Sequence, residues 1–544
     1  MDPAKPPRPK GGAPLAMKKQ GDELRTMPAM LLHNAERDPD ARFLIDDRGT
    51  LSRSGAVELA RGMTHAFSRL GVAKGDTVGI MLDNRREFIA SWFGLACMGA
   101  IEVPVNPANR GDRLVHILNH SQCRVLVVQS EYLHQVDEVA DRLQHLDRVI
   151  VVGQGASTRF TSVSWQDLEV DSRAGNLSAI HVSDPVAVMY TSGSSGPAKG
   201  ALLSHGHHWT NGWQPTSLLD IGPSDTVYCC LPLHHNMAQG YGVWVALVSG
   251  GAIRIAPRFQ VDTFWGDVQA HGATVLSFVG AMLMLLAKQP ESKSDANNPL
   301  RIGFGIPIPP SLHEALERRF GLELVHAYGS TEATIVAWNH GVDRAVGAAG
   351  KILPDYDVRI LGQDDRPVPS GNVGEIAIRP LEPYSMFSGY WREPERTVLA
   401  WRNLWFHSGD RGRIDESGRL WFSDRAEDVV RRMGEFVSPI EVEQVVLSHP
   451  GVRLAAAFGV PSELVEEELM IAVVRQPGAL VSAAELREWA LVRLPRFAVP
   501  RFIDFRTDLP MTPTGKVEKY KLKTAGITPT TDDVRATRRS TGEP

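Results

Sequence analysis

Cysteine is scarce in this chain, with four residues among 544. So few cysteines cannot form the disulfide framework of a small secreted fold, and no two of them have the Cys-x-x-Cys spacing of a structural zinc site. Cys229 and Cys230 are adjacent in the apolar run TVYCCL, which predicts a buried strand. The cysteine content therefore favours a reducing compartment and predicts no structural zinc.

Long apolar runs and an excess of one charge are also missing. No stretch approaches the roughly 18 apolar residues that a membrane-spanning helix requires. The N-terminal residues are rich in Pro, Gly and Lys and lack the apolar segment of a signal peptide. With 58 basic and 63 acidic residues the net charge is −5, which does not indicate nucleic acid or an anionic membrane as a partner. We expect a cytoplasmic protein.

The length exceeds one usual hydrophobic core and predicts at least two domains. From about Pro28, short β-branched runs alternate with helical periodicity, which is typical of an α/β fold with parallel-rich sheets. Within this pattern, Asn84 and Glu87 predict a helix cap. The expected segments are a disordered arm over 1–27, a large N-terminal domain of several subdomains over 28–423, a small α+β C-terminal domain over 424–527 and a disordered tail over 528–544.

The most informative stretch is the run YTSGSSGPAKGALLS at Tyr190–Ser204, which extends a strand-like apolar run. Its glycines allow the backbone to approach an anion, its hydroxyls offer hydrogen-bond donors, and Lys199 adds a positive charge. It is not a Walker loop, because Lys199 lies between Ala198 and Gly200 instead of between Gly and Ser or Thr. From composition alone, a surface linker remains the alternative.

This run resembles the signature of the adenylate-forming superfamily, which includes acyl-CoA synthetases, adenylation domains and luciferase. The usual signature reads Tyr-Thr-Ser-Gly-Thr-Thr-Gly-x-Pro-Lys-Gly. Here two serines replace the two threonines, and the proline has moved by one position to Pro197. The resemblance implies an ATP-phosphate loop, with Thr191 also at the catalytic Mg²⁺. The residues implied in this loop are Thr191, Ser192, Gly193, Ser194, Ser195, Gly196 and Lys199.

A second motif, LELVHAYGSTEA at Leu322–Ala333, is an apolar strand that ends in polar residues. Open α/β sheets bind ligands at such strand ends. It resembles the family's Tyr-Gly-x-Thr-Glu motif. The resemblance implies that Tyr328 stacks on adenine, Thr331 contacts phosphate and Glu332 holds Mg²⁺, which prefers oxygen ligands. It also implies that Gly329 contacts the nucleotide, while Ala327 and Ser330 line the acid pocket.

Two further motifs lie nearer the C-terminus. WFHSGD resembles the family's Thr-Gly-Asp motif and makes Asp410 the candidate ligand of both ribose hydroxyls, and Arg425 matches the family's ribose arginine. The run LPMTPTGKVEKYKL resembles the last family motif and makes Lys516 the candidate catalytic lysine. By the same resemblance, the C-terminal domain is a mobile lid. Glu427 would be its hinge, with Arg431 and Gly434 binding the cofactor.

After the phosphate loop, the chain contains several histidines, in SHGHH at Ser204–His208 and in LPLHHNMAQGYG at Leu231–Gly242. None of them has the His-Glu-x-x-His spacing, so we expect solvated or helix-capping roles. The exception is His235, which resembles the family position where the acid pocket meets the carboxylate. Beside Ala327 and Ser330, five further residues are pocket candidates, of which Phe304 and Ile306 would narrow the pocket. Gly280, Ala281 and Gly305 indicate room for an acid larger than acetate. The candidate pocket residues are His235, Gly280, Phe304, Gly305 and Ile306.

Capping is predicted at Ser438, where Pro439 and Glu441 complete a capping box. This assigns Glu441 a structural role.

The four motifs follow the family order, so the resemblance implies ATP-dependent activation of a carboxylic acid, as a small-molecule substrate, to an acyl-adenylate, with Mg²⁺, and transfer to coenzyme A. Amino-acid adenylation is disfavoured, because Leu233 and His234 lie where an aspartate would pair with a substrate ammonium. Three alternatives stay open: an acyl-AMP ligase that loads an acyl carrier protein, a member that mainly forms the thioester, and a catalytically silent binding relative. Whether the protein forms a homodimer is also left open by the sequence.

Overall fold

The computed structural model describes residues 22–191, 198–292, 295–306, 308, 310–341, 344–425, 430–432, 435–461, 467–494, 496–511 and 517–534. The chain divides into two compact units. Unit 1 comprises Met1–Asp357 and Arg379–Leu404, and unit 2 comprises Val358–Ile378 and Trp405–Pro544. The predicted boundary of a lid domain at residues 423 and 424 stays a prediction.

The first sheet of unit 1 has eight strands in the order β19-β9-β8-β4-β3-β5-β6-β7. From β8 to β7 all neighbours are parallel, whereas β9 and β19 are antiparallel additions at one edge. Strands β3, β4 and β5 are buried throughout, as their apolar runs predict for a sheet covered on both faces. The strands are β3 (Thr77–Met81), β4 (Ile101–Pro104), β5 (Val125–Gln129), β6 (Arg148–Val152), β7 (Thr161–Ser164), β8 (Pro185–Thr191), β9 (Lys199–Ser204) and β19 (Gly389–Tyr390).

The second sheet runs, within unit 1, in the order β16-β15-β14-β13-β12-β10-β11-β1-β2. Its central strands are parallel, and β15, β16 and β2 are antiparallel. The strands are β1 (Arg42–Asp46), β2 (Gly49–Ser52), β10 (Thr226–Cys229), β11 (Ala252–Ile255), β12 (Val275–Val279), β13 (Ile302–Ile306), β14 (Glu323–Ser330), β15 (Thr334–Asn339) and β16 (Gly350–Ile352). The predicted α/β class with parallel-rich sheets is confirmed.

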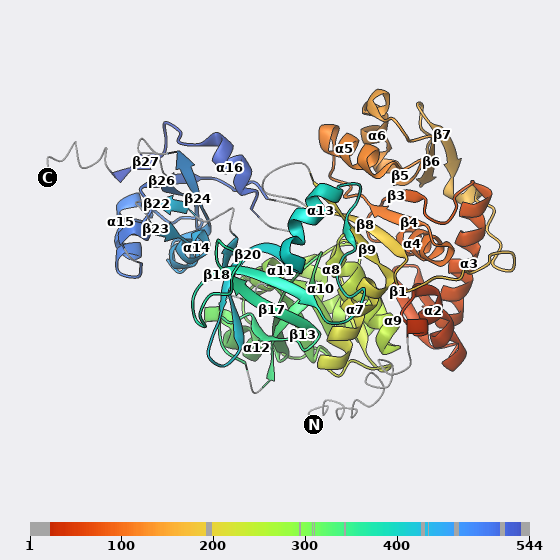
Figure 1. The fold of residues 1–544 in the computed structure, drawn as a ribbon, viewed down its shortest axis with the longest axis horizontal. Coiled ribbons are helices and arrows are strands. Elements are labelled where there is room, and N and C mark those ends of the chain that lie inside the picture. The colour runs from red at the N-terminus through yellow and green to blue at the C-terminus, as the bar shows by residue number, and fades with distance from the viewer. Residues whose placement is uncertain are drawn as a thin grey trace. The chain divides into compact units, whose positions relative to one another are not determined.

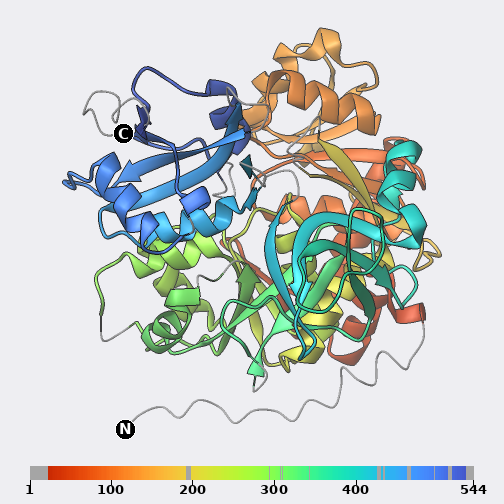
Figure 2. The same ribbon diagram turned by 60° about the vertical axis from the view of Figure 1, so that its left-hand side comes forward.

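Helices connect and cover these strands. Figures 1 and 2 show helices α5 and α6, in orange, beside the strands β5, β6 and β7 of the first sheet. The helices of unit 1 are α2 (Met27–Arg37), α3 (Arg53–Arg69), α4 (Arg86–Met98), α5 (Gly111–Ser121), α6 (Leu133–Glu138), α7 (His205–Leu218), α8 (Asn236–Ala238), α9 (Trp244–Ser249), α10 (Val261–His271), α11 (Gly280–Ala287), α12 (His313–Phe320) and α13 (Pro394–Ala400). Between α8 and α9, Gln239–Val243 forms a π-helical turn, a rare form that is frequent at functional sites.

The described residues of unit 2 form three groups of strands and three α-helices. Strands β17, β18, β20 and β21 are neighbours in that order, β22 pairs with β23, and a further sheet has the order β24-β25-β26-β27. Ser438 caps α14 by accepting from the Glu441 backbone NH at 3.3 Å, and Pro439 is the first helical residue, as predicted. The elements are β17 (Tyr356–Leu361), β18 (Gly374–Pro380), β20 (Phe406–Ile414), β21 (Arg419–Arg425), β22 (Val430–Arg432), β23 (Glu435–Val437), α14 (Pro439–Leu447), β24 (Val452–Pro461), β25 (Glu467–Arg475), α15 (Ala483–Leu491), β26 (Phe502–Arg506), α16 (Lys519–Ala525) and β27 (Asp532–Asp533).

Parts of the two segments predicted to be disordered, 1–27 and 528–544, belong to the described residues and have regular structure. Residues Asp22–Leu24 form a helical turn and Met27, the first residue of α2, is fully buried. At the other end, β27 pairs with β26, and Arg501 donates to both carboxylate oxygens of Asp533. A bidentate pair of this kind orders a polar segment that composition alone predicts to be disordered.

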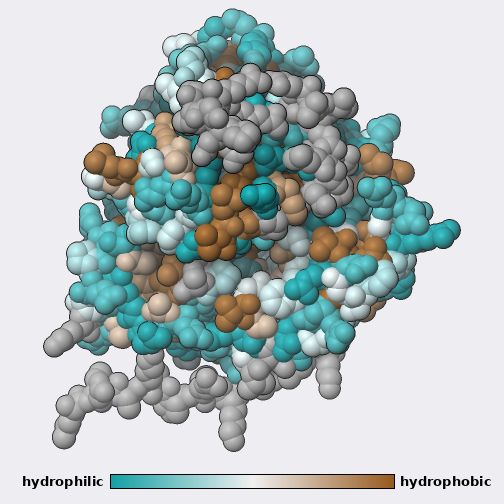
Figure 3. Space-filling view, turned by 90° about the vertical axis from the view of Figure 1, so that its left-hand side faces the viewer, coloured by the Kyte–Doolittle hydropathy of each residue, from teal (hydrophilic) through white to brown (hydrophobic). Residues whose placement is uncertain are grey.

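Among the described residues, no helix is both long enough and apolar enough to span a membrane. On the face shown in Figure 3, hydrophilic residues predominate and apolar residues form scattered patches. Small exposed apolar patches are normal on folded proteins.

Candidate functional site

The predicted phosphate loop joins two antiparallel strands. In the hairpin of β8 and β9, Thr191 lies opposite Lys199 and Tyr190 lies opposite Gly200. An added Cβ at Gly200 would lie 3.3 Å from the Tyr190 ring and 2.7 Å from Val188, so a small residue lets the two strands pack closely. Five predicted loop residues lie outside the described part: Ser192, Gly193, Ser194, Ser195 and Gly196.

Lys199 and Glu332 meet through a tyrosine that the sequence reasoning missed. The Lys199 Nζ lies 5.4 Å from the centre of the Tyr390 ring, within cation–π range. The Tyr390 hydroxyl donates to Glu332 Oε1 at 3.2 Å. Burial, followed by the Glu332 charge, raises the pKa of Tyr390, so this hydroxyl stays protonated as a donor at neutral pH. We call these three residues the Lys199–Tyr390–Glu332 group.

The Tyr-Gly-Ser-Thr-Glu motif lies where β14 turns into β15. At Gly329 an added Cβ would lie 2.0 Å from the Thr334 carbonyl oxygen, so only glycine fits this turn. Ser330 Oγ accepts from the Ala333 backbone NH at 3.1 Å, which closes the turn over Thr331 and Glu332. The neighbouring predicted residues Tyr328 and Ala327 are buried.

The histidines of SHGHH are buried, so their expected solvated roles are wrong. His205, His207 and His208 are all fully buried, and burial lowers the pKa of each, to about 3, 3 and 4 respectively. His207 Nε2 lies 2.8 Å from the Thr331 carbonyl oxygen, which requires an Nε2–H donor. His207 therefore fixes the backbone of the second motif from α7 and is a second residue that the motif search missed.

The predicted acid-pocket residues lie around the π-helical turn and β13. Phe304 is buried and contacts Tyr241 and Trp338, at ring-centre distances of 6.5 and 6.0 Å. His235 precedes α8, its Nε2 is buried without a hydrogen-bond partner, and burial with Arg113 nearby lowers its pKa to about 4. Ile306 ends β13 and Gly280 begins α11, at the carboxyl ends of neighbouring parallel strands.

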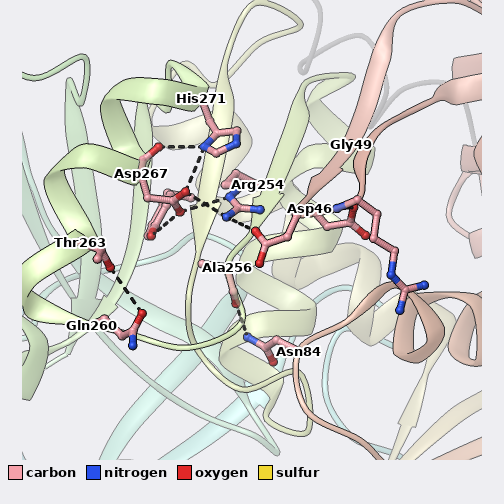
Figure 4. Close-up of polar contacts among 12 residues, drawn as sticks. Asp46, Gly49, Asn84, Arg254, Ala256, Gln260, Thr263, Asp267 and His271 are labelled. Carbon is pink, nitrogen blue, oxygen red and sulfur yellow. Dashed lines mark hydrogen bonds and ion pairs between the residues drawn. The ribbon is translucent and has the colours of Figure 1, made fainter. Parts of the chain in front are cut away.

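Asn84 does not cap α4, which begins at Arg86. Its amide nitrogen donates to the carbonyls of Leu231 and Ala256, at 2.9 and 3.0 Å, and its Oδ1 accepts from the Leu233 backbone NH at 2.8 Å. Figure 4 shows Asn84 reaching Ala256 from the neighbouring part of unit 1. Asn84 thus ties the segment that precedes His235 to the rest of unit 1, and the predicted cap is wrong.

In unit 2, the predicted ribose ligands lie on neighbouring strands. Asp410 of β20 is buried and lies directly opposite Arg425 of β21 in the antiparallel register. Ser408 Oγ accepts from the Asp410 backbone NH at 3.1 Å and donates to the Ile376 carbonyl at 2.6 Å. The strand register therefore places the backbones of Asp410 and Arg425 next to each other.

One further group in unit 2 has metal-ligand chemistry. Ligand atoms of Asp365, Glu375 and His407 lie within 4.8 Å of one another. Glu375, however, is engaged by the protein, since His407 Nδ1 lies 2.9 Å from its Oε2 and its Oε1 accepts from the Gly409 backbone NH at 3.2 Å. These contacts support the turn before Asp410, and we assign the group a structural role.

The structure does not describe the side chains of the remaining predicted site residues. Glu427, Gly434 and Lys516 lie outside the described residues, and for Arg431 only the backbone, in β22, is described. Their roles stay predictions.

Gly305 gives a test of the packing at β13. An added Cβ there would lie 2.0 Å from the Phe278 carbonyl oxygen. The close approach of β12 therefore requires glycine at this position, and the small size of Gly305 is not by itself evidence of space in the acid pocket. We expect Gly305→Ala to destabilise unit 1 by about 1–3 kcal/mol. Thermal unfolding checks this, with Gly266→Ala on α10 as the control, because nothing lies within 4 Å of an added Cβ there. Equal midpoints for the two variants would contradict the packing account.

Comparisons with known proteins place these motifs in context. A family model described as AMP-binding enzyme matches residues 31–391, and one described as AMP-binding enzyme C-terminal domain matches residues 441–516. The crotonobetaine/carnitine–CoA ligase of Salmonella paratyphi A is 29% identical over 464 residues, which cover 84% of this chain and 90% of the relative.

Two solved structures extend the similarity. ATP-bound MatB from Rhodopseudomonas palustris has a TM-score of 0.82 and 25% identity, with 92% of this chain and 98% of that chain covered. The fatty acyl CoA synthetase of Mycobacterium tuberculosis has a TM-score of 0.70 and 27% identity, with 93% and 99% covered.

Proposed function

Because this chain belongs to the AMP-binding enzyme family, we propose that it activates a compact carboxylic acid with ATP and transfers the acyl group to coenzyme A. The family that the motifs predicted is confirmed by the two family-model matches. The predicted reaction class agrees with the relatives, which are acid–CoA ligases. The chemistry has two steps: a carboxylate oxygen attacks the α-phosphorus of ATP and displaces pyrophosphate, and then the thiol sulfur attacks the acyl carbon and displaces AMP.

The observation that carries this proposal is the Lys199–Tyr390–Glu332 group. It joins the base of the phosphate hairpin to the acidic residue of the second motif, although these residues are far apart in the sequence. A cation and a carboxylate held together beside a glycine-rich loop suit a nucleotide triphosphate with its metal ion. A surface linker, the alternative from composition, does not require such contacts.

Magnesium is the metal ion that fits this group. Glu332 is half-buried, and the hydrogen bond that its side chain accepts from Tyr390, within the described part of the chain, uses Oε1. The other carboxylate oxygen of Glu332 could then bind the ion, with the hydroxyl of Thr191 as the second ligand that the motif predicts, and hard oxygen ligands are what Mg²⁺ prefers. When bound, Mg²⁺ would neutralise phosphate charge. Tyr390 orients the carboxylate, and His207 holds the Thr331 carbonyl.

The ribose and catalytic roles follow from the motif positions. Asp410 and Arg425 would hold the ribose, supported by their opposed positions in β20 and β21. Lys516 would neutralise charge at the α-phosphate, and Glu427 would be the hinge between the two half-reactions. Tyr328 would stack on the adenine.

We expect the acid to be compact because the ring of the buried Phe304 packs against Tyr241 of the π-helical turn and Trp338 of β15. A bulky side chain at this predicted pocket position would leave less room for a long chain than a small one. Aromatic rings also suit an acid with a cationic group, and carnitine, which appears in the name of the Salmonella relative, is such an acid.

A panel of acids tests this function. The purified protein is incubated with ATP, Mg²⁺, coenzyme A and one acid at a time: carnitine, crotonobetaine, small aromatic acids, and fatty acids of increasing length. We expect AMP and an acyl-CoA from a compact acid and little product from long fatty acids. AMP formation without an acyl-CoA would indicate a carrier protein as the acceptor. The proposal fails if no acid yields AMP.

A further inference from the structure

Helix α5 presents two different faces. Leu114, Ile117 and Leu118 are buried in the core cluster against β5 and β6. His116 and His120, four residues apart, lie on another face, with their rings stacked at a centre distance of 5.3 Å. The hydrogen-bond partners of the two rings indicate what these histidines do.

The two histidines contact the two ends of the phosphate hairpin. His116 Nε2 lies 2.9 Å from the carbonyl oxygen of Ala198, the residue immediately before Lys199. His120 Nδ1 lies 2.8 Å from the hydroxyl of Tyr190, the residue immediately before Thr191. One helix thus holds both strands at the point where the loop leaves them, as the positions of α5, β8 and β9 in Figure 1 also show.

The partner atom in each contact determines which nitrogen of the histidine ring carries the proton. A carbonyl accepts only, so His116 carries its proton on Nε2. Burial raises the pKa of Tyr190, whose neutral hydroxyl donates to His120 Nδ1, and burial lowers the pKa of His120, so the ring is neutral and can accept.

Helix α13 supplies the other charged groups near His120. Glu393 Oε1 lies 3.9 Å from His120 Nε2, and Arg396 is paired with Glu393 at 2.5 Å. Arg392 is also close enough to His120 to affect its pKa. Glu393 therefore faces the Nε2–H of His120 and favours the tautomer that leaves Nδ1 as the acceptor for Tyr190.

These contacts continue to the candidate site. Ala198 precedes Lys199, Lys199 lies over the Tyr390 ring, and Tyr390 donates to Glu332. The Trp391 backbone NH also donates to the Gly200 carbonyl at 2.7 Å, so β9 is fixed on both sides of Lys199.

We propose that His116 and His120 are positioning residues that hold Ala198 and Tyr190, and that they thereby set the placement of Lys199 and the affinity for the phosphates of ATP. This inference rests on the proposed function for its ligand. It predicts that ATP binding depends on the hydrogen bond from His116, whereas acid binding and thioester formation do not.

ATP titration by calorimetry, in the presence of Mg²⁺ and without any acid, tests this directly. We expect His116→Ala to weaken ATP binding about five- to tenfold, the size expected for one lost hydrogen bond. His116→Gln keeps a donor and should bind within about twofold of wild type. Tyr190→Phe removes only the hydroxyl that donates to His120, and it should weaken ATP binding about three- to tenfold. This second variant keeps the test possible if His116→Ala does not fold.

His134→Ala is the matched control, because His134 is an exposed histidine on the adjacent helix α6. In steady-state assays, His116→Ala should raise KM for ATP and leave KM for the acid and the rate from supplied acyl-adenylate within about twofold.

The inference is overturned if His116→Ala and Tyr190→Phe bind ATP as tightly as wild type, or if His116→Gln is as weak as His116→Ala. The two proposals fail separately. Wild-type protein that binds ATP but activates no acid contradicts the proposed function, while the variants still report on the positioning of Lys199.

Discussion

Lys516→Ala should lower the rate of adenylation about 10²- to 10³-fold, which is the usual effect of removing a preorganised contact to charge that develops in the transition state. The lysine would act on the α-phosphate during attack by the carboxylate, where negative charge builds up. The second step no longer changes bonding at phosphorus in this way, so thioester formation from supplied acyl-adenylate should stay within about threefold of wild type. Single-turnover assays of the two half-reactions measure this difference.

Lys521→Ala is the control for that experiment. Lys521 lies on α16, is half-exposed and forms an ion pair with Glu518. Ion pairs near the surface contribute about 1 kcal/mol or less to the stability of the fold. It should leave both half-reactions unchanged. Equal losses in both half-reactions of Lys516→Ala would remove Lys516 from its assigned role.

Glu332→Gln should lower the adenylation rate by about 10²-fold at low Mg²⁺ and recover part of it as Mg²⁺ is raised. Glutamine has the shape of glutamate and still accepts from the Tyr390 hydroxyl through its amide oxygen, so the Lys199–Tyr390–Glu332 group keeps its geometry. Only the charge that attracts the cation is lost. A magnesium titration of pyrophosphate release, with unfolding followed in parallel, measures the effect.

Glu314→Gln is the matched control, because Glu314 is an exposed carboxylate in the first turn of α12. An unchanged magnesium dependence in Glu332→Gln would exclude Glu332 as the metal ligand.

The sequence predicts the elements of the site well where a motif lies at a strand end. The hairpin of β8 and β9 and the turn after β14 follow from apolar runs that end in glycine and hydroxyl residues. At Gly329, the short distance to the Thr334 carbonyl explains why no other residue fits. These are local features, in which the residues that determine the geometry are close in the sequence.

Contacts between distant segments could not be predicted in this way. Tyr390 lies 58 residues from Glu332, and His116 lies 82 residues from Ala198. Asn84 has the sequence spacing of a helix cap, but its side chain bonds to carbonyls 147 and 172 residues away. Tertiary partners outweigh the local cap preference at such positions.

Burial of the histidines shows the same limit. His205, His207 and His208 look like polar surface residues, yet α7 is buried along most of its length between the sheets. The spacing of His116 and His120 on α5 is the one local signal that two polar side chains share a face, and only the fold shows that this face meets the phosphate hairpin.

The central claim is that the carboxylate of the acid is joined to AMP before it reaches the thiol. An acid labelled with oxygen-18 in its carboxylate tests this most directly, with the products of a complete reaction with ATP and coenzyme A analysed by mass spectrometry. If an acyl-adenylate forms, one labelled oxygen leaves with the phosphoryl group and appears in AMP. Label in inorganic phosphate or pyrophosphate, or unlabelled AMP beside a labelled thioester, would contradict the account.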